Sequence, residues 1–280
     1  MKPETLLDGL VFGEGPRWRD GRLWLSDMHA HTVLNVDLDG KREDVLHVPG
    51  KPSGLGWLPD GRLLVVSMND RRLLRREPDG ALVTHADLSG FTKSPCNDMV
   101  VDGAGRAYVG NFGFDFEHGE KPCTTCLVRV DPDGSAGVAA EELRFPNGSV
   151  VTPDGRTLIV GESFGGCLTA FTIGAEGALS GRREWAKLEG AVPDGICLDA
   201  ENAVWVASPV SSEVLRVREG GAVTARIPLG RPAIACMLGG PDGRTLFVLS
   251  SSSFKAEECL ANRDGRIDGV RVEVPGAGFP

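Results

Sequence analysis

The chain has 280 residues, which is enough for one large domain or two small ones, and its formal net charge is −9. This acidic balance argues against nucleic-acid binding, because a phosphate backbone requires a clustered basic surface. No stretch approaches the roughly 20 apolar residues of a membrane span, and the first residues lack the apolar core of a signal peptide. We therefore expect a cytoplasmic protein with neither a membrane nor a nucleic-acid partner.

One order of elements recurs six times along the chain. Each unit begins with an Asp-Gly turn or a close variant followed by an apolar run, and Asp-Gly supplies the positive φ that a tight hairpin turn requires. The six turns with their apolar runs lie at residues 20–25, 59–66, 102–109, 153–160, 199–206 and 241–248. Further strand-like runs follow most of these hairpins, for example Val33–Asp37 and Asp44–Val48 in the first unit.

Four strands per unit, at a spacing of roughly 40 to 50 residues, are the signature of a β-propeller blade. Six such units account for almost the whole chain, so we expect an all-β fold, a six-bladed β-propeller with four-stranded antiparallel blades, as a single domain over residues 1–280. Glu4–Leu7 is expected to pair beside Val270–Val274, which would close the ring and remove an exposed edge. A β-sandwich would need neither six copies nor this closure.

Propeller geometry predicts that two rings of residues share one face of the molecule. The first strand of each blade begins at this face, which we call the mouth, and the antiparallel second strand ends there. The expected first ring is Glu14, Ser53, Asn97, Asn147, Asp194 and Ala233. The expected second ring is Asp27, Asn69, Asn111, Glu162, Ser208 and Ser250.

Oxygen-donor side chains recur in the first ring, in the segments Glu14-Gly15-Pro16, Cys96-Asn97-Asp98, Pro146-Asn147-Gly148 and Pro193-Asp194-Gly195. Oxygen donors that converge on one axis favour a hard divalent cation. The competing interpretation is that Asn, Asp and Ser before Gly are simply turn formers at strand starts. Agreement among four units, with Glu14 a poor turn former, favours the metal site, and Ala233 would leave the coordination sphere open on one side.

In this order the four segments resemble those of the senescence marker protein/gluconolactonase/luciferin-regenerating enzyme family of six-bladed propellers, over nearly the full length. The resemblance implies that Glu14, Asn147 and Asp194 hold one divalent cation and that Asp194 is the general base. It also implies that Asn97 lies beside the metal and contacts substrate, with Asp115 as a further acidic residue near the mouth. We expect Asn111 of the second ring to contact substrate as well. Oxygen-only ligands favour Ca²⁺, then Mg²⁺, and leave Mn²⁺ and Zn²⁺ open.

One position departs from the family pattern. Sugar-lactone hydrolases of this family often carry an Arg two residues before the equivalent of Asn97, and Pro95 stands there in this chain. Phe112, Phe114 and Phe116 are consistent with a pocket wall more apolar than a sugar requires, although ordinary packing of a long loop explains them equally well. The expected partner is therefore a small-molecule lactone or ester, with a sugar lactone in doubt.

A cation held by oxygen ligands polarises a carbonyl and lowers the pKa of bound water, so a metal-dependent lactonase is expected. A phosphotriester or other ester hydrolase on the same site, and a non-catalytic binding propeller with a structural ion, remain alternatives. Three protein ligands leave a position for water, which favours catalysis.

His29 and His31 fit either a proton-transfer role or a place on the rim. Cys123 and Cys126 lack a second Cys or His pair at zinc-site spacing, so a loop disulfide or a coincidence is expected there.

Overall fold

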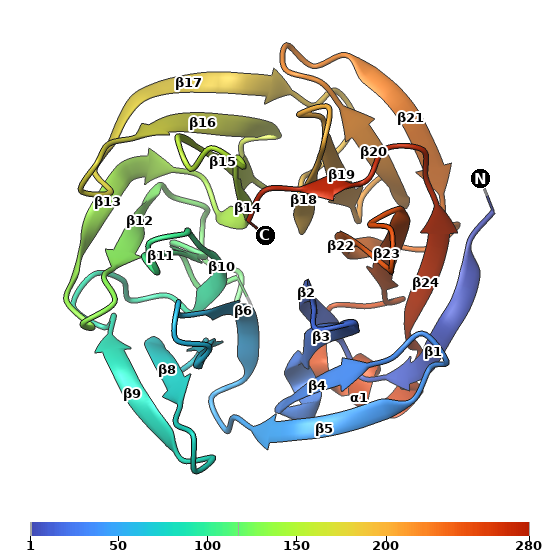
Figure 1. Ribbon diagram of the computed structural model, residues 1–280, viewed down its shortest axis with the longest axis horizontal. Coiled ribbons are helices and arrows are strands. Elements are labelled where there is room, and N and C mark those ends of the chain that lie inside the picture. Colours follow the sequence, from blue (N-terminus) through green and yellow to red (C-terminus); the bar gives the residue numbers. More distant parts are fainter. Residues whose placement is uncertain (1, 117, 280) are drawn as a thin grey trace.

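The computed structural model describes residues 2–116 and 118–279. Six antiparallel sheets are arranged like blades around a central axis (Figure 1). The predicted fold class, an all-β six-bladed β-propeller with four-stranded antiparallel blades, is confirmed. Of the helices that the structure describes, none is long and apolar enough to cross a membrane.

The first three blades are built in chain order, each from four consecutive strands. Blade one contains β2 (Gly13–Arg19), β3 (Arg22–Asp27), β4 (Thr32–Val36) and β5 (Arg42–His47). Blade two contains β6 (Pro52–Trp57), β7 (Leu63–Ser67), β8 (Arg72–Arg76) and β9 (Leu82–Asp87). Blade three contains β10 (Cys96–Val101), β11 (Ala107–Asn111), β12 (Thr125–Val130) and β13 (Ala136–Leu143).

The last three blades follow the same order, except that blade six takes its outer strand from the other end of the chain. Blade four contains β14 (Pro146–Val151), β15 (Thr157–Glu162), β16 (Cys167–Ile173) and β17 (Leu179–Lys187). Blade five contains β18 (Ile196–Asp199), β19 (Val204–Ser208), β20 (Glu213–Val217) and β21 (Val223–Pro228). Blade six contains β22 (Ala233–Gly239), β23 (Thr245–Ser250), β24 (Gly265–Arg271) and β1 (Glu4–Leu10). The two helical segments are η1 (Met28–Ala30) and α1 (Ala256–Asn262).

The ring is closed by the antiparallel pairing of β1 with β24, in which Glu4 lies opposite Gly269 and Leu10 opposite Gly265. The closure was predicted, but β24, the strand that pairs with β1, begins at Gly265, five residues before the expected Val270. Asp268 lies within β24. It is buried in the pair, where Thr5 Oγ1 and Arg266 Nε donate hydrogen bonds to it at 2.8 and 2.9 Å.

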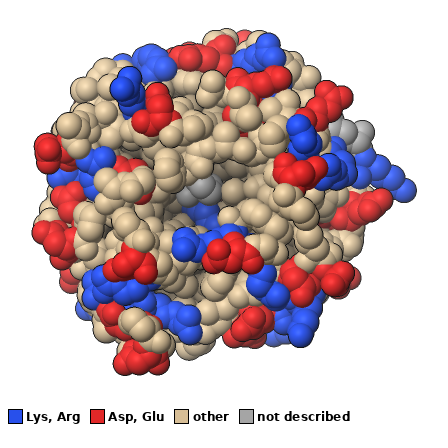
Figure 2. Space-filling model, in the orientation of Figure 1, with Lys and Arg blue, Asp and Glu red and all other residues tan. Residues whose placement is uncertain are grey.

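The C-terminal segment lies at the end of the ring opposite the mouth. There β25 (Gly276–Ala277) pairs with the last residues of β18, and Phe279 forms a bridge to Val151 at the end of β14. Figure 1 looks onto this end and shows the chain end near the axis. In Figure 2 most of the charged side chains on this face lie toward the periphery, around a central hollow. A cavity of about 160 Å³ at this end is lined by Arg17, Trp18, Arg19, Gly56, Trp57, Val101 and Phe279.

Glycines let the inner strands of neighbouring blades approach one another at the mouth. A Cβ on Gly148 would lie 2.5 Å from both the carbonyl oxygen of Asp194 and the amide nitrogen of Ile196 in the next blade. A Cβ on Gly195 would lie 2.4 Å from the Cβ of Ala235 in blade six. The glycine that follows a first-ring residue is therefore required for blade packing, which the turn-former interpretation did not anticipate.

We expect Gly148→Ala to lower the free energy of unfolding by about 1–3 kcal/mol, because the added methyl meets backbone that cannot rotate away. The midpoint of urea unfolding measures this change. Gly137→Ala on outer strand β13 is the matched control, since no atom of the described residues beyond its immediate neighbours lies within 4 Å of a Cβ built there. Equal midpoints for the two variants would contradict this account of the glycine.

Candidate functional site

The inner strands are distorted at the mouth, where the first-ring residues lie. The pairing of the first and second strands is shifted between Glu14 and Arg17, between Cys96 and Met99, and between Pro146 and Ser149. Blades two and six have corresponding shifts. An extra residue in one strand bends it and redirects its side chains, and such bulges are common beside active sites. We infer that the bulges redirect Glu14, Asn97 and Asn147 relative to a regular strand.

Asn147 and Asp194 meet at the mouth between blades four and five. Nδ2 of Asn147 donates hydrogen bonds to Oδ1 of Asp194 at 2.6 Å and to the hydroxyl of Ser163 at 3.1 Å. Ser163 in turn donates to the carbonyl of Pro193 at 2.7 Å. Because the amide nitrogen makes both of these contacts, Oδ1 of Asn147 is the atom of the carboxamide that is available to a cation. Ser163 was not predicted from the sequence, since it follows a second strand rather than starting a first one.

Ionisation of the carboxyl groups of Glu14 and Asp194 is unfavourable in the absence of a cation. Burial raises the pKa of Asp194 to about 8, with Asp98 adding to the shift and the hydrogen bond from Asn147 opposing it. The pKa of Glu14 is raised well above its ordinary value, first by burial and then by repulsion from Asp194 and Asp98. Glu14 keeps partial access to solvent, whereas Asp194 is only 7% exposed. Two neighbouring carboxylates repel each other, so the pair is stabilised when it binds either a proton or a cation.

Asp98 has a different electrostatic environment, because it is paired with Arg17. The guanidinium donates to Oδ1 of Asp98 at 2.8 Å, and the two side chains are 5% and 6% exposed. Arg17 also donates to the carbonyls of Leu55 at 3.0 Å and Pro16 at 2.8 Å and to that of Met99. One guanidinium therefore connects blades one, two and three and neutralises one of the three carboxylates. A single clue to this role is visible in the sequence, since Asp98 stands where the other segments have glycine.

The donor set fits a hard divalent cation. Two carboxylates and one amide oxygen supply only oxygen ligands, and neither Glu14 nor Asp194 forms an ion pair with a described residue. The buried hydroxyl of Ser53, another first-ring residue, has no hydrogen-bond partner in the described part of the chain. Among those residues, no three His, Cys, Asp or Glu side chains form a metal-binding cluster. The candidate site therefore depends on the neutral ligand Asn147.

Most of the second ring anchors backbone, which the sequence did not predict, although the buried hydroxyl of Ser250 has no hydrogen-bond partner among the described residues. Asp27 accepts hydrogen bonds from the amides of Val11 at 3.1 Å and Phe12 at 2.8 Å, just before β2. Glu162 accepts one from the amide of Arg144, just before β14, and Ser208 one from the amide of Val192, before β18. These side chains hold the segment that leads into the first strand of their own blade. In blade two the second strand ends at Ser67, so the expected position of Asn69 in this ring was wrong.

Asn111 shares this anchoring arrangement. Its Oδ1 accepts hydrogen bonds from the hydroxyls of Thr92, Ser94 and Thr125 at 3.1, 3.2 and 2.6 Å, and its Nδ2 donates to the carbonyl of Cys126 at 2.7 Å. The side chain is 1% exposed. These are the contacts of a structural residue, and the predicted contact of Asn111 with substrate stays an untested prediction.

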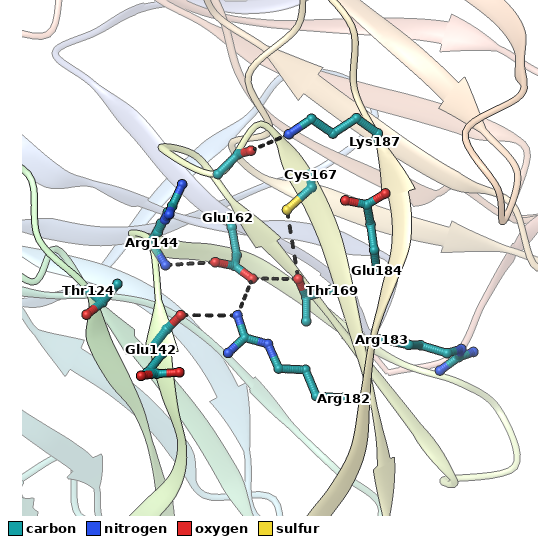
Figure 3. A pocket seen from close by; sticks show the side chains of 11 residues that line it. Thr124, Glu142, Arg144, Glu162, Cys167, Thr169, Arg182, Arg183, Glu184 and Lys187 are labelled. Carbon is teal, nitrogen blue, oxygen red and sulfur yellow. Dashed lines mark hydrogen bonds and ion pairs between the residues drawn. The ribbon is translucent and has the colours of Figure 1, made fainter.

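Glu162 points into a charged pocket on the outer side of blade four, which Figure 3 shows from close by. The pocket has a volume of about 660 Å³ and is lined by Thr124, Glu142, Arg144, Glu162, Gly165, Cys167, Thr169, Arg182, Arg183, Glu184 and Lys187. Arg182 lies 3.2 Å from Glu162, and Lys187 donates to the carbonyl of Gly165 at 3.0 Å. None of the predicted metal ligands lines this pocket, so it is separate from the candidate site.

The remaining predicted residues occupy varied places. Asn97 is 5% exposed, and its Nδ2 lies 3.5 Å from the carbonyl of Pro146, between blades three and four. Asp115 is exposed and accepts a hydrogen bond from the backbone of His118 at 3.0 Å, within the loop after β11.

His29 is buried with its Nε2 3.2 Å from the carbonyl of Phe254, and His31 contacts the carbonyl of Pro49 at 2.8 Å. Cys123 and Cys126 are not joined by a disulfide.

The protein's family follows from comparison with known families. The model described as "SMP-30/Gluconolactonase/LRE-like region" matches residues 12–252, which include Glu14, Asn97, Asn147 and Asp194. The chain belongs to this family. The resemblance inferred from the motifs is thereby confirmed.

Relatives of this SMP-30/gluconolactonase/LRE-like protein include regucalcins. It is 30% identical to regucalcin of Danio rerio over 201 residues, which are 69% of this chain and 66% of that protein. It is 24% identical to regucalcin of Gallus gallus over 270 residues, 91% of this chain and 88% of that protein.

Solved structures share the propeller. A regucalcin of Agrobacterium tumefaciens, described as a calcium-binding protein, has a TM-score of 0.83 at 22% identity over 100% of this chain and 96% of that one. A gluconolactonase of Xanthomonas campestris has a TM-score of 0.77 at 24% identity over 99% of this chain and 89% of that one. At these identities the two structures support the fold of this family member.

Proposed function

We propose that the protein is a hydrolase that opens a lactone and that it depends on a divalent cation held by Glu14, Asn147 and Asp194. The observation that carries this proposal is the pair of carboxyl groups at the mouth, the half-buried Glu14 and the buried Asp194, without an ion-pair partner among the described residues. Membership in the SMP-30/gluconolactonase/LRE-like family and the likeness to a gluconolactonase support the reaction class. The calcium-binding regucalcin supports Ca²⁺ as the first candidate, with Mg²⁺, Mn²⁺ and Zn²⁺ to be compared.

The residues at the mouth suit general base chemistry. When bound, the cation supplies Lewis acidity toward a carbonyl oxygen and toward water. Asp194 accepts the proton of the water that attacks the lactone carbonyl and returns it to the ring oxygen as the acyl C–O bond of the ring breaks. The hydrogen bond from Nδ2 of Asn147 fixes the orientation of its carboxylate. Glu14 and Oδ1 of Asn147 contribute the other oxygen ligands. Asn97 and Asp115 are proposed to contact the rest of the substrate.

The proposal is tested by hydrolysis of a panel of lactones after metal has been removed with a chelator. Aliphatic, aromatic and sugar-derived lactones, an aryl ester and a phosphotriester are each assayed with Ca²⁺, Mg²⁺, Mn²⁺ or Zn²⁺ added back. We expect cation-dependent opening of at least one lactone. Turnover of only the phosphotriester or the aryl ester would replace the lactonase assignment, and no turnover despite stoichiometric cation binding would favour a structural ion.

We further expect cation affinity to rise with pH below about pH 8. The carboxylates must be ionised to bind a cation, and burial raises the pKa of Asp194 to about 8. At pH 7 Asp194 alone should therefore release about one proton for each bound cation. This release lowers the apparent affinity by up to about tenfold per unit of decreasing pH, and Glu14, whose pKa is also raised, adds to the effect. Titration calorimetry in two buffers of different ionisation enthalpy measures the proton release. Binding without proton release would contradict the predicted state of Asp194.

The stability of the metal-free protein should depend on pH with the opposite sign. Because the pKa of Asp194 is raised in the folded state, its protonation stabilises the fold most below the unfolded pKa of about 4. The free energy of unfolding should therefore fall as pH rises from about 4 to about 8. Thermal unfolding across this range, with and without the cation, compares the two forms.

A further inference from the structure

Five phenylalanines form one aromatic cluster across the boundary between blades three and four. Phe112 and Phe145 are stacked with ring centroids 4.4 Å apart, and Phe114 meets Phe164 edge to face at 5.2 Å. Phe116 contacts both Phe145 and Phe164 at 6.2 Å. The sequence suggested only the three rings of one loop, since Phe145 and Phe164 come from blade four.

The cluster adjoins the candidate site through the backbone of blade four. Phe145 directly precedes Pro146 and Asn147, and Phe164 directly follows Ser163, whose hydroxyl accepts a hydrogen bond from Asn147. The amide of Ser163 donates to the carbonyl of Phe145 at 3.1 Å. The segments that carry two of the rings therefore also hold a candidate metal ligand.

The neighbours of these rings in sequence belong to a different surface. Arg144 and Gly165 line the charged pocket on the outer side of blade four (Figure 3), whereas the adjacent Phe145 and Phe164 belong to the aromatic cluster. The amide of Phe164 donates to the carbonyl of Arg144 at 3.3 Å, so the two segments run side by side. Together they separate a charged surface from an apolar one.

The cluster is incompletely covered, and its exposure forms part of a pattern at the mouth. Phe116 and Phe164 are 47% and 45% exposed. Val210 and Phe254 are 72% and 44% exposed, and each of these four residues lies in the connection after the second strand of a different blade. Blades three to six thus each place an exposed apolar side chain on the same face. Exposed apolar side chains that gather around a site favour an apolar ligand group.

We infer that the aromatic cluster is a specificity surface that binds an apolar substituent on the substrate, so the preferred substrate is a lactone with an alkyl or aryl side chain. This inference rests on the proposed function. The lactone carbonyl is placed at Glu14, Asn147 and Asp194, and the substituent extends over Phe116 and Phe164. A polyhydroxylated lactone would leave hydroxyl groups against these rings without hydrogen-bond partners, which lowers its affinity.

The test compares γ-butyrolactone with γ-decalactone, which carries a hexyl chain on the same ring, in the Ca²⁺-loaded protein. We expect kcat/KM to be at least about tenfold higher for the hexyl compound, because burial of several methylene groups favours its binding. In Phe116→Ser/Phe164→Ser this ratio should fall about tenfold. Val138→Ser removes a side chain of similar exposure, 49%, from outer strand β13 and should leave the ratio unchanged.

A binding measurement that does not depend on turnover separates this inference from the proposed function. Saturation-transfer NMR with 5-hexyl-2-pyrrolidone and 2-pyrrolidone, the corresponding lactams, should show stronger binding of the hexyl lactam and its loss in the double variant. If the parent protein prefers the hexyl lactam, the double variant loses this preference, and neither protein hydrolyses a lactone, the specificity surface is retained and the proposed function is rejected. Hydrolysis with equal kcat/KM for both lactones, or a preference for glucono-δ-lactone, would overturn the inference. It would also be overturned if the double variant changed the oligomeric state seen by sedimentation but not the binding of the hexyl lactam.

Discussion

Replacing Asp194 by Asn or Ala is expected to lower kcat/KM for lactone opening by about 1,000-fold or more while leaving the fold intact. The change removes a proposed cation ligand and the proposed general base together. Asp194→Asn keeps the size of the side chain and removes a charge whose burial is unfavourable, as the raised pKa of Asp194 shows. The metal-free Asn variant should therefore be at least as stable as the parent protein.

Steady-state kinetics with the best substrate of the panel, together with thermal unfolding of the same samples, check this prediction. Asp115→Asn at the rim is a useful comparison, because Asp115 is exposed and is not a proposed cation ligand. Its effect should be confined to KM and should be much smaller. Unchanged turnover in Asp194→Asn would remove Asp194 from the mechanism.

Replacing Arg17 by Ala is expected to lower the free energy of unfolding by about 3–5 kcal/mol. The substitution leaves Asp98 buried and unpaired, and a lone buried charge is strongly destabilising. It also removes the donor for the carbonyls of Leu55 and Met99 in the neighbouring blades. Denaturant unfolding measures the loss.

Arg19→Ala is the matched control for Arg17→Ala. Arg19 lies two residues further along β2 and pairs with Asp20, but the two side chains are 37% and 81% exposed. An exposed pair contributes about 0–1 kcal/mol, so this variant should unfold near the parent midpoint. The double variant Arg17→Met/Asp98→Asn should recover part of the lost stability, because no charge remains buried. Equal effects of Arg17→Ala and Arg19→Ala would show that the buried pair has no special role.

The architecture could be predicted from the sequence because its signals are local and repeated. Each Asp-Gly turn, or the variant at Asp199, fixes one hairpin, and six such hairpins identify the blades without knowledge of any contact between them. The first-ring oxygen donors were predicted in the same way, as one position repeated in four units, and the family resemblance then singled out Glu14, Asn147 and Asp194 as the expected ligands. Which direction a side chain faces depends on the bulges at the mouth, and a shift of one residue reverses it. The outward direction of Glu162 and the anchoring contacts of Asn111 therefore emerged only from the structure.

Contacts between blades were the second feature that the sequence did not reveal. Arg17 reaches Asp98 across 81 residues, and the Phe112–Phe145 stack joins two blades. Neither pair repeats from unit to unit, so no periodic signal marks it. Ser163 likewise acts through Pro193 of the next blade. The electrostatics and the aromatic surface of the site both depend on such non-repeating contacts.

Calorimetric titration of the metal-stripped protein with Ca²⁺ tests the central claim most directly. The parent protein should bind one cation per chain, and Glu14→Gln and Asn147→Ala should each weaken binding by about tenfold or more. Glu142→Gln, in the separate charged pocket, should leave it unchanged. The same comparison with Mg²⁺, Mn²⁺ and Zn²⁺ covers the other candidate ions. Binding of equal strength in the parent protein and in the Glu14 and Asn147 variants would contradict the assignment of this site.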